Sequence, residues 1–290
     1  MFNHSFNNYM RHAFPHDELL PMSCSGKDTW GGYSLTLVDA LGTLLVVGQR
    51  GEFRQAVGWL CANLDFDRDI AVSVFETNIR VLAGLISAHL LARDDATLGV
   101  PPEHVTRLQS LAVDLGRRLL RAFDTPTGIP YGTINLRHGV PRGEVDVTCV
   151  AGGGTFALEF GVLSALTGDA SFERAALRAA AALLALRSTK GLLGNHVNIS
   201  DGSWPYRDSG IGHGVDSYFE YLHKAAVLFD DVRYERLYRL AVPPFERYLY
   251  RDGFYLEVDM STLTTTWAVF NSLQAFWPGV LAERGELVRQ

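Results

Sequence analysis

The sequence predicts an all-α fold built from helical hairpins, and three observations support this prediction. Nine segments of the 290-residue chain place apolar side chains three and four positions apart, the period of an amphipathic helix. Short polar or glycine-containing turns separate several of these segments, and an aromatic residue follows each such turn. Segments with the two-residue period of a strand are nearly absent. Repeated helix pairs of this kind favour a closed ring or a stacked array of hairpins.

The nine expected helices form about four or five hairpins. Three turns join consecutive helices, and we expect the aromatic residue after each turn to pack back onto the preceding helix: Gly48–Gly51 before Phe53, Thr167–Asp169 before Phe172, and Asp230–Val232 before Tyr234. The expected helices are Ser34–Val47, Glu52–Leu64, Val72–Leu91, Glu103–Phe123, Thr155–Leu166, Ala170–Leu186, Asp216–Phe229, Arg233–Tyr248 and Thr264–Phe276.

Two segments break the helical pattern. Residues 124–136 and 191–204 alternate polar and apolar side chains around turn residues, and Asp201-Gly202 is a hairpin signal. We therefore expect short β-hairpin insertions between helices. No low-complexity linker or shift in composition interrupts the chain, so residues 1–290 are predicted to be a single domain.

Composition excludes several classes of protein. A chain that is 47% hydrophobic and 11% aromatic is not disordered. The net charge of −6 leaves no basic excess, which argues against a nucleic-acid partner. No uninterrupted apolar run reaches the ~18 residues of a transmembrane span. Met1–His4 lacks a charged and then apolar start, so no signal peptide is expected in this chain.

Three cysteines are too few for a disulfide scaffold. Cys61 lies in an apolar helical setting and is predicted to be a core thiol. Cys24 and Cys149 both lie in loop-like sequence and could pair. No Cys-x-x-Cys spacing occurs, which argues against structural zinc.

Glu76 is the first acid that stands out. Its spacing is compatible with two interpretations, an ordinary ion pair with Arg80 four residues later on an exposed face, or a functional carboxylate. Val81 and Leu82, with the apolar residues around them, leave little polar face for the first interpretation. The pattern leaves both open.

Three more acids have similarly ambiguous settings. Glu159 stands between Leu158 and Phe160, where a buried acid must be paired or protonated. Asp216 follows a glycine-rich stretch and Glu220 lies one turn later, which suits either a functional cleft or a capped helix start. The aromatic residues between them suit a sugar-binding cleft and a helical core equally well.

These motifs resemble the α-mannosidases of glycoside hydrolase family 47, and within it the endoplasmic reticulum (ER) degradation-enhancing α-mannosidase-like branch. The resemblance runs along nearly the whole chain. It rests on residues 8–19, residues 33–41, Ser73-Val-Phe-Glu-Thr-Asn-Ile-Arg80, residues 128–136, Leu158-Glu-Phe160, Leu166–Asp169, Val215-Asp-Ser-Tyr-Phe-Glu-Tyr-Leu222 and Gln274-Ala-Phe-Trp-Pro-Gly279.

The resemblance implies an (α/α)7 barrel, bound calcium and inverting removal of α-1,2-linked mannose from N-glycans. It implies that Glu76 is the acid and that Asp216 activates water. Arg80, Glu159 and Glu220 match positions that line the mannose-binding cleft. Inversion requires an acid on the leaving oxygen and a carboxylate holding water on the opposite sugar face, roughly 6.5–9.5 Å apart. The apolar surroundings of Glu76 are expected to help it keep its proton.

The sequence departs from the family pattern at several points. Gly42 stands where the family has an acid. The family's Arg-Pro-Glu motif, which supplies a further carboxylate, has no counterpart up to Gln290, and neither has the Glu-Thr motif whose threonine binds calcium. The expectation is therefore an incomplete barrel, missing its C-terminal part, with no metal ligand of its own and with calcium implied only by resemblance.

The branch also implies a compartment and partners. It places the chain in the ER lumen, where a Cys24–Cys149 disulfide and the N-glycosylation sequons Asn3-His-Ser5 and Asn198-Ile-Ser200 would fit. The implied partners are high-mannose N-glycans on misfolded glycoproteins, and an oxidoreductase.

Three functions remain open from the sequence. The first is an α-1,2-mannosidase-like protein that trims N-glycans of misfolded glycoproteins during ER-associated degradation. The second is a non-enzymatic, high-mannose glycan-binding protein that recognises the same substrates. The third is an inactive, truncated fragment, which predicts no activity for this chain alone.

Overall fold

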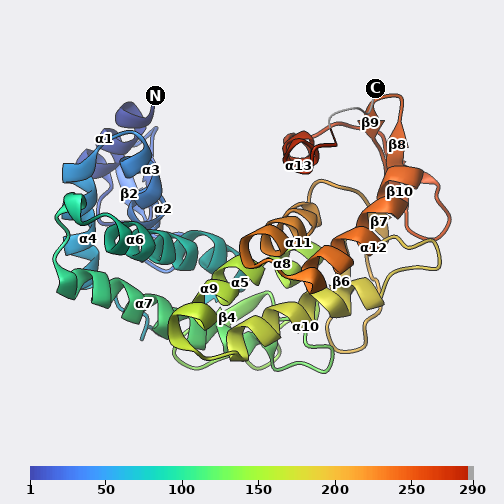
Figure 1. The fold of residues 1–290 in the computed structure, drawn as a ribbon, viewed down its shortest axis with the longest axis horizontal. Coiled ribbons are helices and arrows are strands. Elements are labelled where there is room, and N and C mark those ends of the chain that lie inside the picture. The colour runs from blue at the N-terminus through green and yellow to red at the C-terminus, as the bar shows by residue number, and fades with distance from the viewer. Residues whose placement is uncertain (287–290) are drawn as a thin grey trace. The chain divides into compact units, whose positions relative to one another are not determined.

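The computed structural model describes residues 1–286 and shows a predominantly helical chain with a few short strands (Figure 1). The chain divides into two compact units. Unit 1 contains residues 1–121 and 133–142, and unit 2 contains residues 122–132 and those from 143 onward. The single domain expected for residues 1–290 stays a prediction.

Unit 1 contains two helical hairpins, α3–α4 and α6–α7, in which α3 packs against α6 and α4 against α7. One strand pair joins β1 to β2 and another joins β3 to β4, both antiparallel. The elements are α1 (Phe2–His12), β1 (Glu18–Leu20), β2 (Ser25–Lys27), α2 (Leu35–Asp39), α3 (Leu41–Val46), α4 (Arg50–Asn63), β3 (Ala71–Ser73), α5 (Val74–Glu76), a π-helix (Thr77–Leu82), α6 (Ala83–Asp94), a 3₁₀ turn (Ala96–Leu98), α7 (Pro102–Leu120) and β4 (Thr133–Asn135).

Unit 2 repeats this arrangement with the hairpins α9–α10 and α11–α12, in which α9 packs against α11 and α10 against α12. Its strands form two pairs, β5–β6 and β8–β9, and a three-stranded sheet in the order β11-β10-β7. The elements are β5 (Val147–Cys149), α8 (Val150–Gly154), α9 (Ala157–Thr167), α10 (Ser171–Ala185), β6 (His196–Asn198), β7 (Asp208–Ser209), α11 (Asp216–Phe229), α12 (Val232–Leu249), β8 (Tyr250–Arg251), β9 (Phe254–Tyr255), β10 (Glu257–Asp259), β11 (Thr265–Trp267), a 3₁₀ turn (Ser272–Gln274) and α13 (Trp277–Glu283). A further 3₁₀ turn, Arg121–Phe123, lies where the two units meet in the sequence.

The predicted helix Thr264–Phe276 is wrong. Residues 265–267 form β11, which pairs with β10, and a helix begins only at Trp277. Three consecutive threonines before Trp267 favour a strand, because β-branched and aromatic side chains pack well on a pleated surface. Asn271 caps a 3₁₀ turn, and Pro278 fits the first turn of α13.

The two segments predicted as β-hairpin insertions contain strands, but these strands pair with partners far away in the sequence. β4 pairs with β3, and β6 pairs with β5. An isolated bridge joins each segment to a residue just beyond its end, Asn135 to Gly139 and His196 to Tyr206. An alternating pattern predicts a strand but does not identify its partner. Both pairs lead directly into helices, since β3 precedes α5 and β5 precedes α8.

Asp17 organises the start of α2 in unit 1. Its side chain is fully buried and accepts hydrogen bonds from the backbone N–H groups of Trp30, Gly32, Tyr33 and Leu35, at 2.8–3.1 Å. A carboxylate with several backbone donors can remain buried without a cation. These four hydrogen bonds therefore fix the loop that leads into α2.

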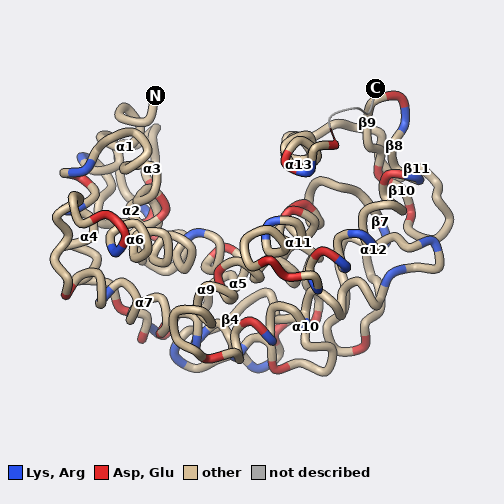
Figure 2. The backbone as a smooth tube through the Cα atoms, in the orientation of Figure 1, with Lys and Arg blue, Asp and Glu red and all other residues tan. Residues whose placement is uncertain are grey.

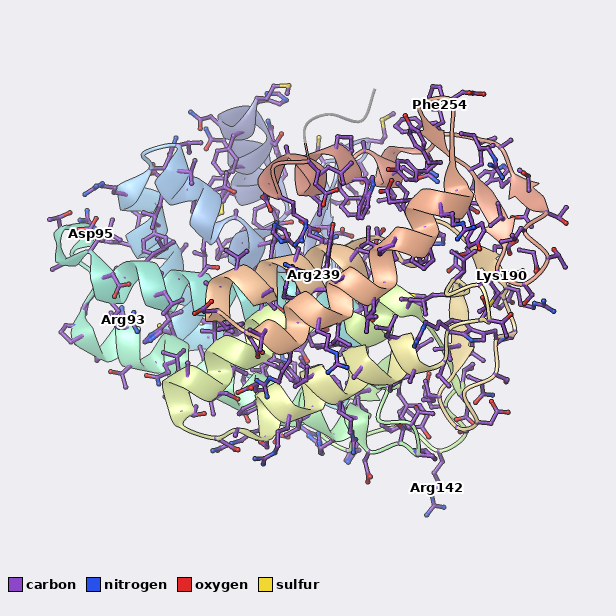
Figure 3. All side chains as sticks on the ribbon, turned by 45° about the vertical axis from the view of Figure 1, so that its right-hand side comes forward. Arg93, Asp95, Arg142, Lys190, Arg239 and Phe254 are labelled. Carbon is purple, nitrogen blue, oxygen red and sulfur yellow. The ribbon has the colours of Figure 1, made fainter. Side chains whose placement is uncertain are left out.

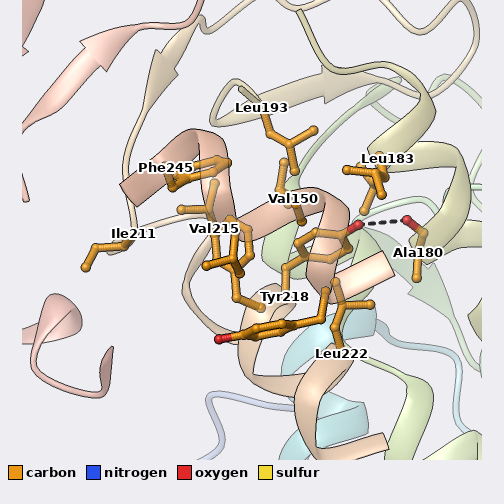
Figure 4. Close-up of a cluster of buried hydrophobic side chains, with 14 of the residues drawn as sticks. Val150, Ala180, Leu183, Leu193, Ile211, Val215, Tyr218, Leu222 and Phe245 are labelled. Carbon is orange, nitrogen blue, oxygen red and sulfur yellow. Dashed lines mark hydrogen bonds between the residues drawn. The ribbon is translucent and has the colours of Figure 1, made fainter. Parts of the chain in front are cut away.

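The core of unit 2 surrounds the first half of α11 (Figure 4). Tyr218 is completely buried, and its hydroxyl donates to the carbonyl oxygen of Ala180 on α10 at 2.9 Å. A Cβ on Gly154 would lie 2.3 Å from the Tyr218 ring. Only glycine allows α8 to approach α11 this closely.

Charged side chains lie mainly outside this core. Lys and Arg positions are interspersed with Asp and Glu positions along the chain (Figure 2). Exposed residues such as Arg93, Arg142 and Lys190 extend away from the ribbon (Figure 3).

Two continuous helical stretches, Val74–Asp94 and Val150–Thr167, are long and apolar enough to cross a membrane by length and composition alone. The most apolar parts of these stretches are 50% and 72% buried within the structure. Core helices of globular proteins meet the same criteria, so the finding carries little weight. The expected absence of a transmembrane span stays a prediction.

The loop that enters α11 provides a test of this packing. Gly214 has φ +83°, and a Cβ there would lie 1.9 Å from Oδ1 of Asn195, whereas Gly168 has φ +73° with nothing within 4 Å. Both Gly→Ala substitutions impose left-handed strain of about 1–2 kcal/mol. Gly214→Ala adds a steric clash, so we expect it to lower the free energy of unfolding by about 1–3 kcal/mol more than Gly168→Ala. Urea unfolding measures the difference, and equal losses would contradict the packing described.

Candidate functional site

In unit 1, Glu76 lies in the first turn of a helix that follows directly from a strand. β3 ends at Ser73, and the Ser73 hydroxyl accepts a hydrogen bond from the Glu76 backbone N–H at 3.2 Å. This cap fixes the helix start. A carboxylate in a first turn is also stabilised by the partial positive charge of the helix N-terminus.

Arg80 pairs with Glu76 one turn later. Its Nε donates to Oε2 of Glu76 at 2.7 Å, and its Nη1 lies 3.2 Å from Oδ2 of Asp39 at the end of α2. Burial alone would lower the pKa of Arg80, but the hydrogen bonds and negative charges of Glu76 and Asp39 together outweigh burial, so the pKa of Arg80 lies above its usual value. The sequence suggested apolar surroundings for Glu76, and the structure gives it a guanidinium partner instead.

Close helix packing brings Asp39 to Arg80. A Cβ on Gly84 would lie 2.7 Å from the carbonyl oxygen of Val38, so glycine at this position lets α6 approach α2. A groove of about 350 Å³ beside the pair is lined by Asp39, Gly42, Thr43, Val46, Ile79, Ala83, Gly84 and Ser87. Gly42 lies where the family resemblance leads us to expect an acid. A Cβ at this position would meet nothing within 4 Å, so the absence of a side chain leaves open space in the groove.

In unit 2, two hydrogen bonds connect the start of α9 with the start of α11. The hydroxyls of Thr155 and Ser217 lie 2.9 Å apart, and the Tyr221 hydroxyl donates to Oε1 of Glu159 at 2.8 Å. Glu159 follows Thr155 by four residues and Tyr221 follows Ser217 by four residues, a spacing of about one helical turn. The two pairs therefore form successive contacts between neighbouring helices, and they hold the buried Glu159 carboxylate in place.

Burial determines how the groups of this cluster titrate. It raises the pKa of the Tyr221 phenol, and the negative charge of Glu159 raises that pKa further, so Tyr221 keeps its proton and its hydroxyl donates a hydrogen bond to Glu159. Burial also raises the pKa of Asp216 above its usual value, although hydrogen bonds from the backbone and hydroxyl of Ser217 oppose this. Asp216 therefore titrates closer to neutrality than an ordinary aspartate.

Glu220 has a different partner. Lys224, four residues later on α11, donates from Nζ to Oε1 of Glu220 at 2.7 Å. Asp216, Glu220 and Lys224 thus follow one another at one-turn spacing along α11, next to Tyr221. The structure places Asp216, Glu159 and Glu220 on adjoining helices of unit 2, and it places Glu76 and Arg80 together in unit 1.

Several residues of these clusters were missed from the sequence. Tyr221 and Asp39 gave no signal by themselves, although both lie within the matching motifs. Glu257 on β10 is 8% exposed, and burial and the nearby Asp208 raise its pKa. His213, just before α11, opposes the rise in pKa at both Glu257 and Asp216. Glu257 could have been noticed as a lone acid between Leu256 and Val258.

All three cysteines are free thiols in the structure. Cys24 is exposed in unit 1, while Cys149 in unit 2 accepts the Gly152 N–H at 3.2 Å and caps α8. Burial raises the pKa of the Cys149 thiol. The structure thus contains no Cys24–Cys149 disulfide, and that pairing stays a prediction.

Calcium takes oxygen ligands such as carboxylates and carbonyls. Within residues 1–286, no group of three or more His, Cys, Asp or Glu side chains is arranged to hold a metal ion. The calcium ion implied by the family resemblance stays a prediction.

Curated relatives match nearly the whole chain. The human ER degradation-enhancing alpha-mannosidase-like protein 2 is 48% identical over 290 residues, which cover 99% of this chain and 50% of that protein. Alpha-mannosidase I MNS4 of Arabidopsis thaliana is 50% identical over 287 residues, covering 99% of this chain and 46% of that protein. The chain thus spans about half the length of these relatives.

A solved structure has a similar fold. The alpha-1,2-mannosidase from Trichoderma reesei superposes with a TM-score of 0.88 at 27% sequence identity, covering 99% of this chain and 63% of that chain. The signature of Glycosyl hydrolase family 47 matches residues 1–290. Because this signature covers the whole sequence and the relatives match nearly all of it, the chain belongs to glycosyl hydrolase family 47.

Proposed function

We propose that the chain is an α-1,2-mannosidase-like protein that trims mannose from N-glycans of misfolded glycoproteins in ER-associated degradation. One observation carries this proposal: Glu76, Glu159 and Asp216 each lie in the first turn of a helix, where neighbouring side chains hold them. We further propose that its hairpins form part of an (α/α)7 barrel. The stacked pairs α3–α4 with α6–α7, and α9–α10 with α11–α12, support this.

In the proposed inverting reaction, Glu76 donates a proton to the glycosidic oxygen as the C–O bond to the leaving sugar breaks. Asp216 accepts a proton from the water whose oxygen attacks the anomeric carbon. Its raised pKa makes Asp216 a stronger base than an ordinary aspartate. Arg80 positions the Glu76 carboxyl, while Glu159 and Glu220 are proposed to accept hydrogen bonds from mannose hydroxyls.

The partners follow from the relatives. The name "ER degradation-enhancing alpha-mannosidase-like protein" supports the ER as the compartment and a mannose-containing substrate. We propose the ER lumen and high-mannose N-glycans on misfolded glycoproteins. An oxidoreductase partner and a calcium requirement remain part of the proposal. No step above is assigned to a metal.

Glu76→Gln tests the acid. Glutamine keeps the shape of the side chain but cannot donate the proton, so we expect mannose release from a high-mannose N-glycan to fall about 10²–10⁴-fold. Free mannose is measured by chromatography, with circular dichroism to confirm folding. Glu103→Gln is the control, because Glu103 is also a first-turn glutamate of unit 1 but is exposed, whereas Glu76 is half-buried, so this substitution should leave release unchanged. Unchanged release by Glu76→Gln would remove Glu76 as the acid.

Glycan binding by calorimetry without any release from the unmodified chain would contradict the enzymatic proposal and favour glycan recognition.

The pH dependence tests Asp216. Asp216 must be ionised to accept a proton, and its raised pKa means that it becomes protonated at a higher pH than an ordinary aspartate. As the pH is lowered, kcat/KM should therefore begin to fall at a pH above ~3.9, the usual pKa of an aspartate. Asp216→Asn should abolish turnover at every pH. An acid limb at or below the ordinary value would show that burial does not tune this group.

A further inference from the structure

We propose that Asn198 is an N-glycan attachment site of the folded chain and that Asn3, the other sequon asparagine, is not. The inference rests on the ER compartment in the proposed function, but not on mannosidase activity. The two sequons, Asn3-His-Ser5 and Asn198-Ile-Ser200, are equivalent as sequence motifs. The structure distinguishes them.

Asn198 lies at the last position of β6 and begins an exposed turn. Its side-chain oxygen accepts the backbone N–H of Ser200 at 2.8 Å and that of Asp201 at 3.3 Å. This is an Asx-turn, in which the asparagine side chain folds over the two residues that follow. The conformation brings the carboxamide of Asn198 and Ser200 of the same sequon together.

The rest of the turn holds this arrangement toward solvent. Ile199, the middle residue of the sequon, is fully buried, and its N–H donates to the carbonyl oxygen of Asp146 at 2.8 Å. Its own carbonyl oxygen accepts from the Thr127 hydroxyl at 2.7 Å. Ser200 and Asp201, the next two residues, are exposed. The core thus anchors the centre of the sequon while its neighbours face outward.

The nitrogen of the Asn198 carboxamide is available for attachment. Within the described residues it donates no hydrogen bond, and it is not among the buried side-chain atoms that lack a partner, so solvent reaches it. A glycan on this nitrogen would displace no described contact. The Asx-turn would persist, because it uses only the side-chain oxygen.

Asn3 has a different setting. It lies in α1, and the N–H of Ser5 donates to the carbonyl oxygen of Met1 at 3.2 Å as part of the helix. That N–H is therefore not available to the Asn3 side chain. The Asn3 carboxamide instead contacts Gln49 at 2.8 Å. The Asn3 sequon is exposed but helical, and it therefore lacks the turn that brings the Asn198 carboxamide next to the serine of its own sequon.

The chemistry is a group transfer from a lipid-linked diphosphate oligosaccharide. The Asn198 nitrogen forms a bond to C1 of the terminal N-acetylglucosamine, and the bond from C1 to the diphosphate oxygen breaks. The lipid diphosphate leaves with the electron pair, and the nitrogen loses one proton to a base. No oxidation or reduction occurs.

In the test, the full chain is fused to a heterologous signal sequence and translated in a cell-free system that contains ER microsomes. A shift in gel mobility reports the attachment of one glycan. Protection from added protease identifies the imported chains. Peptide N-glycosidase should remove a single glycan from the unmodified chain and from Asn3→Gln. Asn198→Gln and Ser200→Ala should carry none.

Other outcomes overturn the inference. These are no glycan on protease-protected chains, a glycan retained by Asn198→Gln, or a glycan lost by Asn3→Gln. Since Asn198→Gln could impair folding, Ser200→Ala provides an independent check that leaves the asparagine intact. The readout is separate from mannose release. A glycan on a chain without activity counts against only the proposed function, and activity on an unglycosylated chain counts against only this inference.

Discussion

The close approach of α8 and α9 to α11 is the constraint on which the arrangement of unit 2 depends. Gly154 makes this approach possible, because any side chain there would collide with the buried ring of Tyr218. Once the helices are this close, Thr155 meets Ser217 and Glu159 meets Tyr221. Asp216 is placed by the same contact, since its carboxylate accepts from Ser217. Backbone space, hydrogen bonding and carboxylate position are thus determined together.

Hydrogen bonds of this kind also explain how buried and half-buried acids are tolerated. An unpaired carboxylate in a protein interior is strongly unfavourable, whereas one hydrogen bond to a charged group contributes about 1.5–3 kcal/mol. Tyr221 supplies such a bond to Glu159, and Ser217 supplies two to Asp216. Unit 1 uses the same principle with different groups. Arg80 pairs with Glu76, and Gly84 lets α6 approach α2 so that Asp39 reaches the same guanidinium.

Local patterns predicted local structure well. The segment Asp216–Phe229 is a helix at those residues, and the turns before Phe53, Phe172 and Tyr234 do connect packed helices. These features depend on periodicity, capping and glycine turns, which involve neighbouring residues only. The helix expected over Thr264–Phe276 failed for the same reason. Its apolar spacing resembles a helix, but β10 offers a partner strand that local periodicity does not reveal.

The sequence indicated some contacts of the candidate site and not others. The motifs include Glu76, Glu159 and Asp216, and the partners of Glu76 and Asp216 are near them in sequence, but other contacts join distant segments. Tyr221 is separated from Glu159 by 62 positions, and Asp39 from Arg80 by 41. Similarly, strand alternation located β4 and β6 but not their partners β3 and β5. Only the fold shows that such residues meet.

The configuration of the released sugar tests the central claim most directly. If Glu76 protonates the leaving oxygen while Asp216 activates water, one displacement inverts the anomeric carbon. Proton NMR of an α-1,2-linked mannobiose digest, recorded before mutarotation, should show β-mannose as the first product. Initial α-mannose, or no mannose from the folded chain, would contradict the account.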